Sequence, residues 1–116
     1  MSEQSCLFCR IVAGEIPAKE VYSDDTSVAF RDLNPKAPVH VLIVPRNHIS
    51  SISDMTADDE QKIGHLFRVA GIIAQAEGIA EKGYRTVINT GENAGQSVFH
   101  IHVHLLGGRG LAWPPG

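Results

Sequence analysis

The stretch His100-Ile101-His102-Val103-His104-Leu105-Leu106 decides how this chain of 116 residues is interpreted. Three of the six histidines of the chain occupy every second position of this apolar run. A β-strand points alternate side chains to opposite faces, so the run predicts a strand with three imidazoles on one face and an apolar core on the other. At a rise of about 3.3 Å per residue, neighbouring imidazoles stand ~6.6 Å apart, close enough to act on one ligand.

Three interpretations of these histidines fit the sequence. They are hydrogen-bonded members of a half-exposed sheet face, or ligands of a zinc ion through a His-x-His pair, or a nucleophile with neighbours that orient it and move protons. The preceding loop contains Gly91 and Gly95, which give its backbone conformational freedom. Its amides, with that of Val98, can form a nest for phosphate oxygens, and Asn89 and Ser97 add neutral donors. A phosphate nest beside a histidine strand favours attack at phosphorus.

Length and composition limit the classes of function. A chain of this length predicts one domain, residues 1–116, with a core that needs no disulfide. The net charge of −3 provides no basic surface for duplex nucleic acid. No signal pattern opens the sequence and no apolar run approaches the ~20 residues that span a bilayer, so we expect a cytoplasmic protein without membrane association. Cys6 and Cys9 are then expected to be reduced.

The rest of the chain alternates predicted strands with two predicted helices. Ser5 is the expected cap of a short helix that reaches about Ala13, and Thr56 that of a long helix that reaches about Glu77. The expected strands are 20–23, 27–32, 40–44, 84–89 and 100–106. One long and one short helix on an antiparallel sheet of about five strands is an α+β fold. His65 lies in the long helix, where we expect a solvated side chain without a role.

Several further motifs accompany the histidine run, and together they are distinctive. They are Phe8, Gly14-Glu15-Ile16-Pro17-Ala18, Ala29-Phe30-Arg31-Asp32, Ala37-Pro38-Val39-His40, Val44-Pro45, His48-Ile49-Ser50 and Trp113-Pro114-Pro115-Gly116. With the segment from Gly95 to Arg109, they make the chain resemble the histidine triad nucleotide-binding proteins, in the Hint branch of purine nucleoside phosphoramidases. The resemblance covers the chain from Leu7 onward and implies that family's fold, with the sheets of two subunits paired in a homodimer. One departure is Ala94-Gly95, where relatives often have two glycines.

The resemblance implies a covalent mechanism that requires no cofactor for the chemistry. His102 is expected to attack the α-phosphorus of a nucleoside 5′-phosphoramidate and expel an amine. Water then hydrolyses the nucleotidyl-histidine to a nucleoside monophosphate. A carbonyl near His100 is expected to hold the reactive tautomer of the nucleophile, while His104, Ser97 and His40 handle phosphate oxygens and protons.

The resemblance also implies a site for purine nucleoside monophosphates and their phosphoramidates. Asp32 is expected to bind the ribose hydroxyls, and Trp113 either selects the substrate side chain across the dimer or anchors the tail. The other expected nucleotide-binding residues are Leu7, Phe8, Ile11, Ile16, Leu33, Asn89, Gly95, Ser97, Val98, His102 and His104. The apolar members of this set hold a purine by stacking and buried area, which separates adenine from guanine only weakly.

Cys6 and Cys9 form a CxxC pair without the βαβ context of a redox motif. Some relatives, mainly bacterial, bind zinc through the matching cysteines and two histidines. The resemblance therefore implies a structural Zn²⁺ held by Cys6, Cys9, His48 and His100, which leaves the other two triad histidines free for chemistry. The alternative is a pair of ordinary buried thiols beside a short helix.

Other functions compete with the phosphoramidase. A dinucleoside polyphosphate hydrolase and a nucleotidyltransferase of the same family use the same intermediate. A nucleotide-binding adapter needs no turnover, and a zinc hydrolase would use the triad as metal ligands. The C-terminal Trp-Pro-Pro-Gly and His104 favour the phosphoramidase branch.

Overall fold

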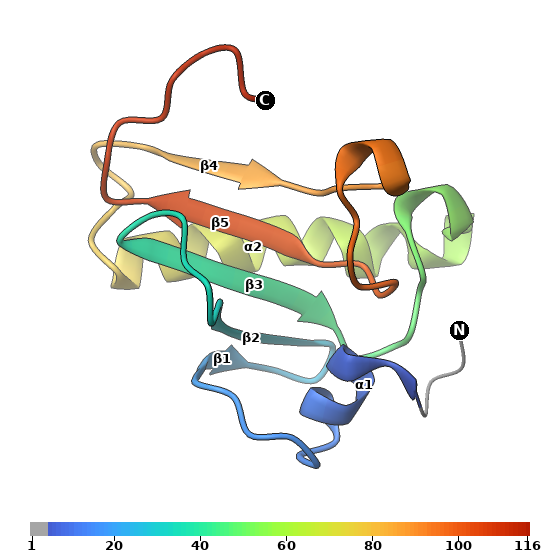
Figure 1. Cartoon of the computed structure of the whole chain (residues 1–116). Helices are drawn as coiled ribbons and strands as arrows, with labels where there is room; N and C mark the ends of the chain where they lie inside the picture. Colours follow the sequence, from blue (N-terminus) through green and yellow to red (C-terminus); the bar gives the residue numbers. More distant parts are fainter. Residues whose placement is uncertain (1–4) are drawn as a thin grey trace.

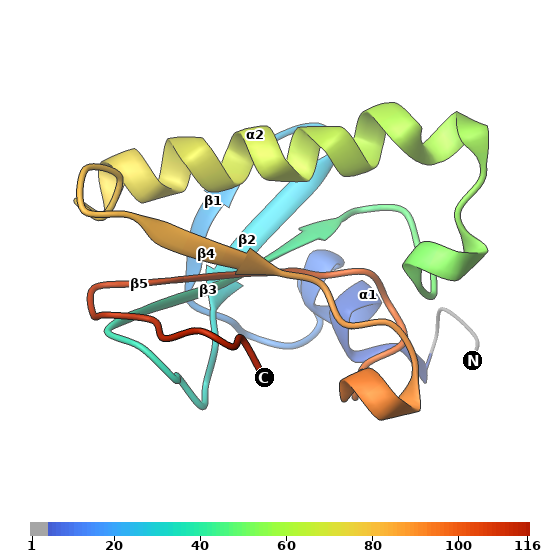
Figure 2. The same ribbon diagram turned by 90° about the horizontal axis from the view of Figure 1, so that it is seen from above.

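The computed structural model describes residues 5–116 and confirms the α+β arrangement. The strands form a single five-stranded sheet. Figure 1 shows this sheet, and Figure 2 shows the long helix lying along one of its faces. The helices are α1 (Leu7–Val12) and α2 (Glu60–Ala76), and the strands are β1 (Glu20–Ser23), β2 (Ser27–Arg31), β3 (Val39–Pro45), β4 (Tyr84–Val87) and β5 (Val103–Gly107). Their order in the sheet is β1-β2-β3-β5-β4, and every pairing is antiparallel. Within residues 5–116, no helix has the length and apolar character needed to cross a membrane.

Two apolar cores lie on opposite faces of this sheet. On β3, Val41 and Ile43 pack in the core under α2, while Leu42 and Val44 pack in the core beside α1. This strand is buried on both faces, which explains its nearly unbroken apolar sequence. The apolar residues of the histidine run, Ile101, Val103 and Leu105, also belong to the α2 core. The predicted alternation is therefore confirmed, and the histidines project to the α1 face.

The ends of several elements differ from the prediction. The expected cap Ser5 is wrong: α1 is capped by Cys6, whose Sγ accepts a hydrogen bond from the N–H of Cys9 at 3.4 Å. β5 begins only at Val103, so two of the three histidines precede the strand. The other strand ends shift by one or two residues: β2 ends at Arg31, β3 spans Val39–Pro45 and β4 ends at Val87.

The long helix contains one clear correction. The predicted start signal at Thr56 opens a 3-10 turn, in which Asp59 accepts a hydrogen bond from the Thr56 N–H at 2.9 Å, and α2 follows from Glu60. His65 is not a side chain without a role, because its Nε2 lies 2.7 Å from Oδ2 of Asp24. This contact joins α2 to the turn between β1 and β2.

Candidate active site

Two adjoining hollows lie on the histidine face of the sheet. The first, the apolar pocket, has a volume of about 260 Å³ and is lined by Leu7, Phe8, Ile11, Ile16, Pro17, Ala18, Phe30, Arg31, Asp32, Leu33, Leu42, Ser97, Val98, His102 and His104. The second, the polar hollow, has a volume of about 420 Å³ and is lined by Asp32, Asn34, Lys36, His40, Val87, Asn89, Ser97, His104 and Leu106. Asp32, Ser97 and His104 line both, so the two hollows meet at these residues.

Two of the expected nucleotide-binding residues line neither hollow. Gly95 ends the 3-10 turn Glu92–Ala94 with φ +81°, a conformation that favours glycine. Trp113 is 81% exposed in the single chain. The departure at Ala94 is accommodated, because every described residue with positive φ is a glycine. The loop therefore needs its glycines at positions 91 and 95 and tolerates alanine between them.

Some of the lining residues were not predicted from the sequence. Pro17 and Phe30 lie within the motifs that carried the resemblance, so their position there was a usable signal. Asn34 and Lys36 belong to a proline-containing loop that reaches the site only because it folds over His40. No local pattern in the sequence indicates that long-range placement.

His102 is oriented by the backbone that precedes it. Its Nδ1 lies 2.8 Å from the carbonyl oxygen of His100. A carbonyl only accepts, so Nδ1 carries the proton and Nε2 keeps a free lone pair, as the expected role requires. Burial lowers the pKa of His102, opposed in part by this hydrogen bond and by the charge of Asp32. The Phe8 ring packs against the His102 ring in a T-shaped arrangement, with 5.0 Å between centroids.

A second chain of contacts fixes the other two catalytic candidates. The backbone N–H of Lys36 donates to Nδ1 of His40 at 3.0 Å, so the neutral His40 ring carries its proton on Nε2. This Nε2 lies 2.9 Å from Nδ1 of His104 and donates to it. The proton of neutral His104 is therefore on Nε2. The triad thus offers a lone pair on His102 beside an N–H on His104.

The surroundings keep these rings neutral at pH 7. Burial, followed by the charges of His102 and His40, lowers the pKa of His104 to about 4, while Asp32 opposes the shift. Burial also lowers the pKa of His40. A neutral ring holds one proton, so the hydrogen-bond partners decide which nitrogen carries it.

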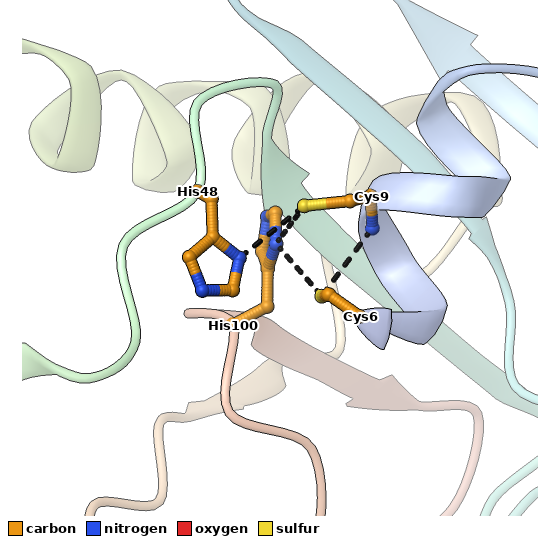
Figure 3. A group of neighbouring side chains, drawn as sticks. All are labelled: Cys6, Cys9, His48 and His100. Atoms are coloured by element: carbon orange, nitrogen blue, oxygen red, sulfur yellow. Dashed lines mark hydrogen bonds between the residues drawn. The ribbon is translucent and has the colours of Figure 1, made fainter. Parts of the chain in front are cut away.

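Four predicted metal ligands converge at the start of α1 (Figure 3). The Sγ atoms of Cys6 and Cys9 lie 3.4 and 3.5 Å from Nδ1 of His100, and Sγ of Cys9 lies 3.2 Å from Nδ1 of His48. A tetrahedral zinc ion places sulfur and nitrogen ligands about 3.6 Å apart. The carbonyl of Pro45 lies 2.8 Å from Nε2 of His100 and accepts a hydrogen bond from its N–H, so Nδ1 presents a lone pair to the thiols. These residues fit a zinc ion.

A second group of residues with metal-binding side chains comprises Asp32, His40 and His104. This group fits a metal ion less well than the first group. Its ligand atoms lie within 4.8 Å of one another. However, the Lys36 N–H occupies Nδ1 of His40. A metal bound at Nε2 would move the ring proton to Nδ1, directly against that N–H. This group is built to hold protons, which disfavours a zinc hydrolase with its metal among these histidines.

Comparisons with known proteins agree with this site. Residues 13–111 match the family model of the HIT domain. The chain is 53% identical over 116 residues to an uncharacterized HIT-like protein of Synechococcus elongatus, covering 100% of both. It is 50% identical over 111 residues to the purine nucleoside phosphoramidase of Escherichia coli, covering 96% of this chain and 92% of that protein. The crystal structure of a HIT family hydrolase from Legionella pneumophila matches with a TM-score of 0.95 at 51% identity, covering 97% of this chain and 100% of that one. The chain therefore belongs to the HIT family of histidine triad proteins.

Proposed function

We propose that this protein is a purine nucleoside phosphoramidase. It hydrolyses nucleoside 5′-phosphoramidates, and the related acyl-adenylates, to nucleoside monophosphates through a nucleotidyl-histidine intermediate. The observation that carries the proposal is the opposite protonation of two neighbouring rings, a lone pair on Nε2 of His102 and a proton on Nε2 of His104. Their centroids are 5.0 Å apart where the two hollows meet. The 50% identity to the Escherichia coli phosphoramidase supports the same reaction.

The two hollows divide the substrate into parts. The apolar pocket receives the purine between side chains such as Phe8 and Ile16. Asp32, at the border of the pocket, accepts the ribose hydroxyls. The phosphate then lies beside Nε2 of His102, and the Ser97 hydroxyl and the Nε2–H of His104 are neutral donors for its oxygens.

The reaction proceeds by two displacements at phosphorus. Nε2 of His102 forms a bond to phosphorus, the P–N bond of the substrate breaks, and the leaving nitrogen takes the Nε2 proton of His104. Solvent water returns a proton to that ring, so His104 stays neutral while phosphorylated His102 carries the positive charge. Water then attacks phosphorus, the bond to His102 breaks, and the proton that this water loses passes to solvent through His104. Covalent catalysis of this kind replaces one difficult displacement by two easier ones.

We assign a structural role to zinc, held by Cys6, Cys9, His48 and His100. A bound ion would join the start of α1 to the segment before β5 without entering the reaction. Only one of the two imidazoles has hydrogen-bond support on its other ring nitrogen, because Nε2 of His48 is buried without a partner among the described residues. The Pro45 carbonyl supplies that support to His100.

We also propose that the protein is a homodimer joined through β4. This strand is an edge of the sheet, so its outer backbone groups lack a strand neighbour in the single chain. The C-terminal tail is tied to the same strand, because Arg85 donates to the carbonyls of Leu111 and Ala112 at 3.2 and 3.0 Å. Pairing at β4 would therefore bring the exposed Trp113 toward a second subunit. Light scattering after gel filtration tests this, and a monomer at micromolar concentration contradicts it.

The experiment that tests the reaction uses adenosine 5′-phosphoramidate with the wild type, with His102→Ala and with a strong chelator. We expect chelator-resistant release of AMP that the variant loses. Diadenosine tetraphosphate is assayed in parallel, because faster cleavage of that substrate would favour the polyphosphate hydrolase. A wild type that binds AMP but cleaves neither substrate would favour the adapter.

A further inference from the structure

The polar hollow begins where the proposed displacement takes place. Asp32, Ser97 and His104 line both hollows, whereas His102 lines only the apolar pocket and Lys36 only the polar hollow. The attacking and leaving groups of a phosphoryl transfer lie roughly in line on opposite sides of phosphorus. With the nucleoside in the apolar pocket, the departing amine therefore extends into the polar hollow.

Two charged residues line this hollow, Asp32 and Lys36, and they differ in the contacts that their side chains already make. Asp32 lies at the border with the apolar pocket, where its carboxylate accepts the Asn34 N–H at 2.8 Å and lies 3.4 Å from Nε2 of His40. Lys36 is the cation of the hollow, and no acidic side chain within residues 5–116 forms an ion pair with it. The side chain of Asn89 adds an uncharged polar group. The polar hollow thus presents the unpaired positive charge of Lys36 to the departing amine.

The backbone holds Lys36 in a fixed place beside the catalytic rings. Its N–H donates to Nδ1 of His40 at 3.0 Å, and its carbonyl accepts from Nε and Nη2 of Arg109 at 3.0 and 2.9 Å. Burial lowers the pKa of His40, the charge of Asp32 raises it, and the charge of Lys36 lowers it. Lys36 therefore lines the polar hollow together with His40 and His104, and it is an exposed residue.

We propose that Lys36 is a specificity-determining residue that favours phosphoramidates whose amine carries an anionic group, a carboxylate or a phosphate. The inference rests on the proposed phosphoramidase function and names its preferred leaving groups. An ion pair at an exposed position contributes modestly, so Lys36 ranks substrates and does not exclude neutral ones. A carboxylate or phosphate near the scissile nitrogen is the feature it recognises.

The test compares adenosine 5′-phosphoramidates in matched pairs. Glycine is paired with glycinamide and 2-aminoethyl phosphate with ethanolamine, so each pair differs mainly in its anion. The readout is the ratio of kcat/KM within a pair, compared between the wild type, Lys36→Gln, Lys36→Glu and the control Lys82→Gln, which lies outside both hollows. Comparing ratios cancels the intrinsic difference in reactivity of the two amines. The carboxylate pair and the phosphate pair show which anion is preferred.

We expect the ratio to fall roughly threefold to fivefold in Lys36→Gln and about tenfold in Lys36→Glu, with no change in the control. Added salt should lower the wild-type ratio. Equal ratios in the wild type and Lys36→Glu for both pairs would overturn the proposal. The same pairs can be compared without turnover. Calorimetry measures the affinity of each phosphoramidate for His102→Ala and for the double variant His102→Ala, Lys36→Gln, and the ratio of affinities within a pair is compared between the two proteins. If the wild type cleaves none of these substrates, the proposed phosphoramidase function is wrong. The ratio of binding affinities within each pair still decides the role of Lys36.

Discussion

Single backbone groups determine what each histidine of the site can do. The carbonyl of His100 places the proton of His102 on Nδ1, and the N–H of Lys36 places that of His40 on Nε2. His104 takes its tautomer from His40. Three chemically identical side chains thereby become an acceptor, a positioning residue and a donor.

This assignment predicts a pattern of nitrogen resonances. At pH 7, long-range ¹H–¹⁵N spectra should show His102 as the Nδ1–H tautomer and both His40 and His104 as Nε2–H. The reason is that His102 donates to a carbonyl, which only accepts, and His40 accepts from a backbone N–H, which only donates, so His40 must donate to His104. An Nδ1–H tautomer for His104 would contradict the direction of the His40 contact.

Removing His40 should disturb catalysis through its neighbour. In His40→Ala we expect kcat to fall roughly 10²–10³-fold, because general acid–base groups contribute on this scale. The same spectra should then show a mixed tautomer for His104, which a merely structural defect would not produce. His65→Ala is the control and should keep its rate, since His65 lines neither hollow. An unchanged tautomer in His40→Ala would argue against the positioning role.

At the scale of elements, one carboxylate ties the hairpin of β1 and β2 to α2. Asp24 accepts from the N–H groups of Thr26 and Ser27 at 2.9 and 2.8 Å, and its Oδ2 lies 2.7 Å from His65. Burial raises the pKa of Asp24, but hydrogen bonds from His65 and the turn hold it well below its ordinary value. Asp24→Ala should therefore lower the free energy of unfolding by roughly 2–3 kcal/mol in urea titrations. Asp25 is an exposed neighbour, and Asp25→Ala should change the free energy of unfolding by less than about 0.5 kcal/mol. Equal losses in the two variants would refute the proposed role of Asp24 in joining the hairpin to α2.

The stability that the start of α1 gives to the fold should depend on a bound metal ion. We expect about one zinc ion per chain in the purified wild type, and its loss in the Cys6→Ser, Cys9→Ser double variant. Unfolding temperature should fall by about 5 °C or more, because metal binding to the folded state adds to stability. A strong chelator should produce the same shift in the wild type, which separates metal loss from altered packing. Purified protein that takes up no zinc even from excess metal would rule the site out.

Local periodicity explains why the elements were predictable while their connections were not. The alternation through Ile101 and Val103 predicted which side chains share a face, because that pattern is a property of the strand itself. The cap at Cys6 was missed because Ser5 has the stronger general preference, whereas the position of the first turn depends on packing. The Pro45 carbonyl that supports His100 is 55 residues away, and no local signal reports it. The zinc ligands also come from distant parts of the sequence, so they were predicted from the family resemblance and not from a local pattern.

At the scale of the whole molecule, folding buries histidines in neutral form, and acid should therefore destabilise it. His104 has a folded pKa of about 4 against an ordinary value of 6.5. As pH falls below 6.5, the unfolded chain takes up a proton that the folded site does not, so the contribution of His104 to stability falls until about pH 4 and then levels off. His40 acts in the same direction, because burial lowers its pKa as well.

The window between pH 6.5 and 5 separates the buried histidines from the carboxylates, because carboxylates with lowered pKa, such as Glu77, lose their contribution only at lower pH. Over that window His104 alone should cost roughly 1.5 kcal/mol of unfolding free energy. Urea titrations of the wild type and His104→Gln test this, since glutamine still accepts a hydrogen bond from His40 but takes up no proton. The variant should show the smaller decline, and the gap between the two curves should close toward pH 5. Parallel curves would mean that His104 titrates alike in the folded and unfolded chain, and the neutral relay on which the mechanism depends would then fail.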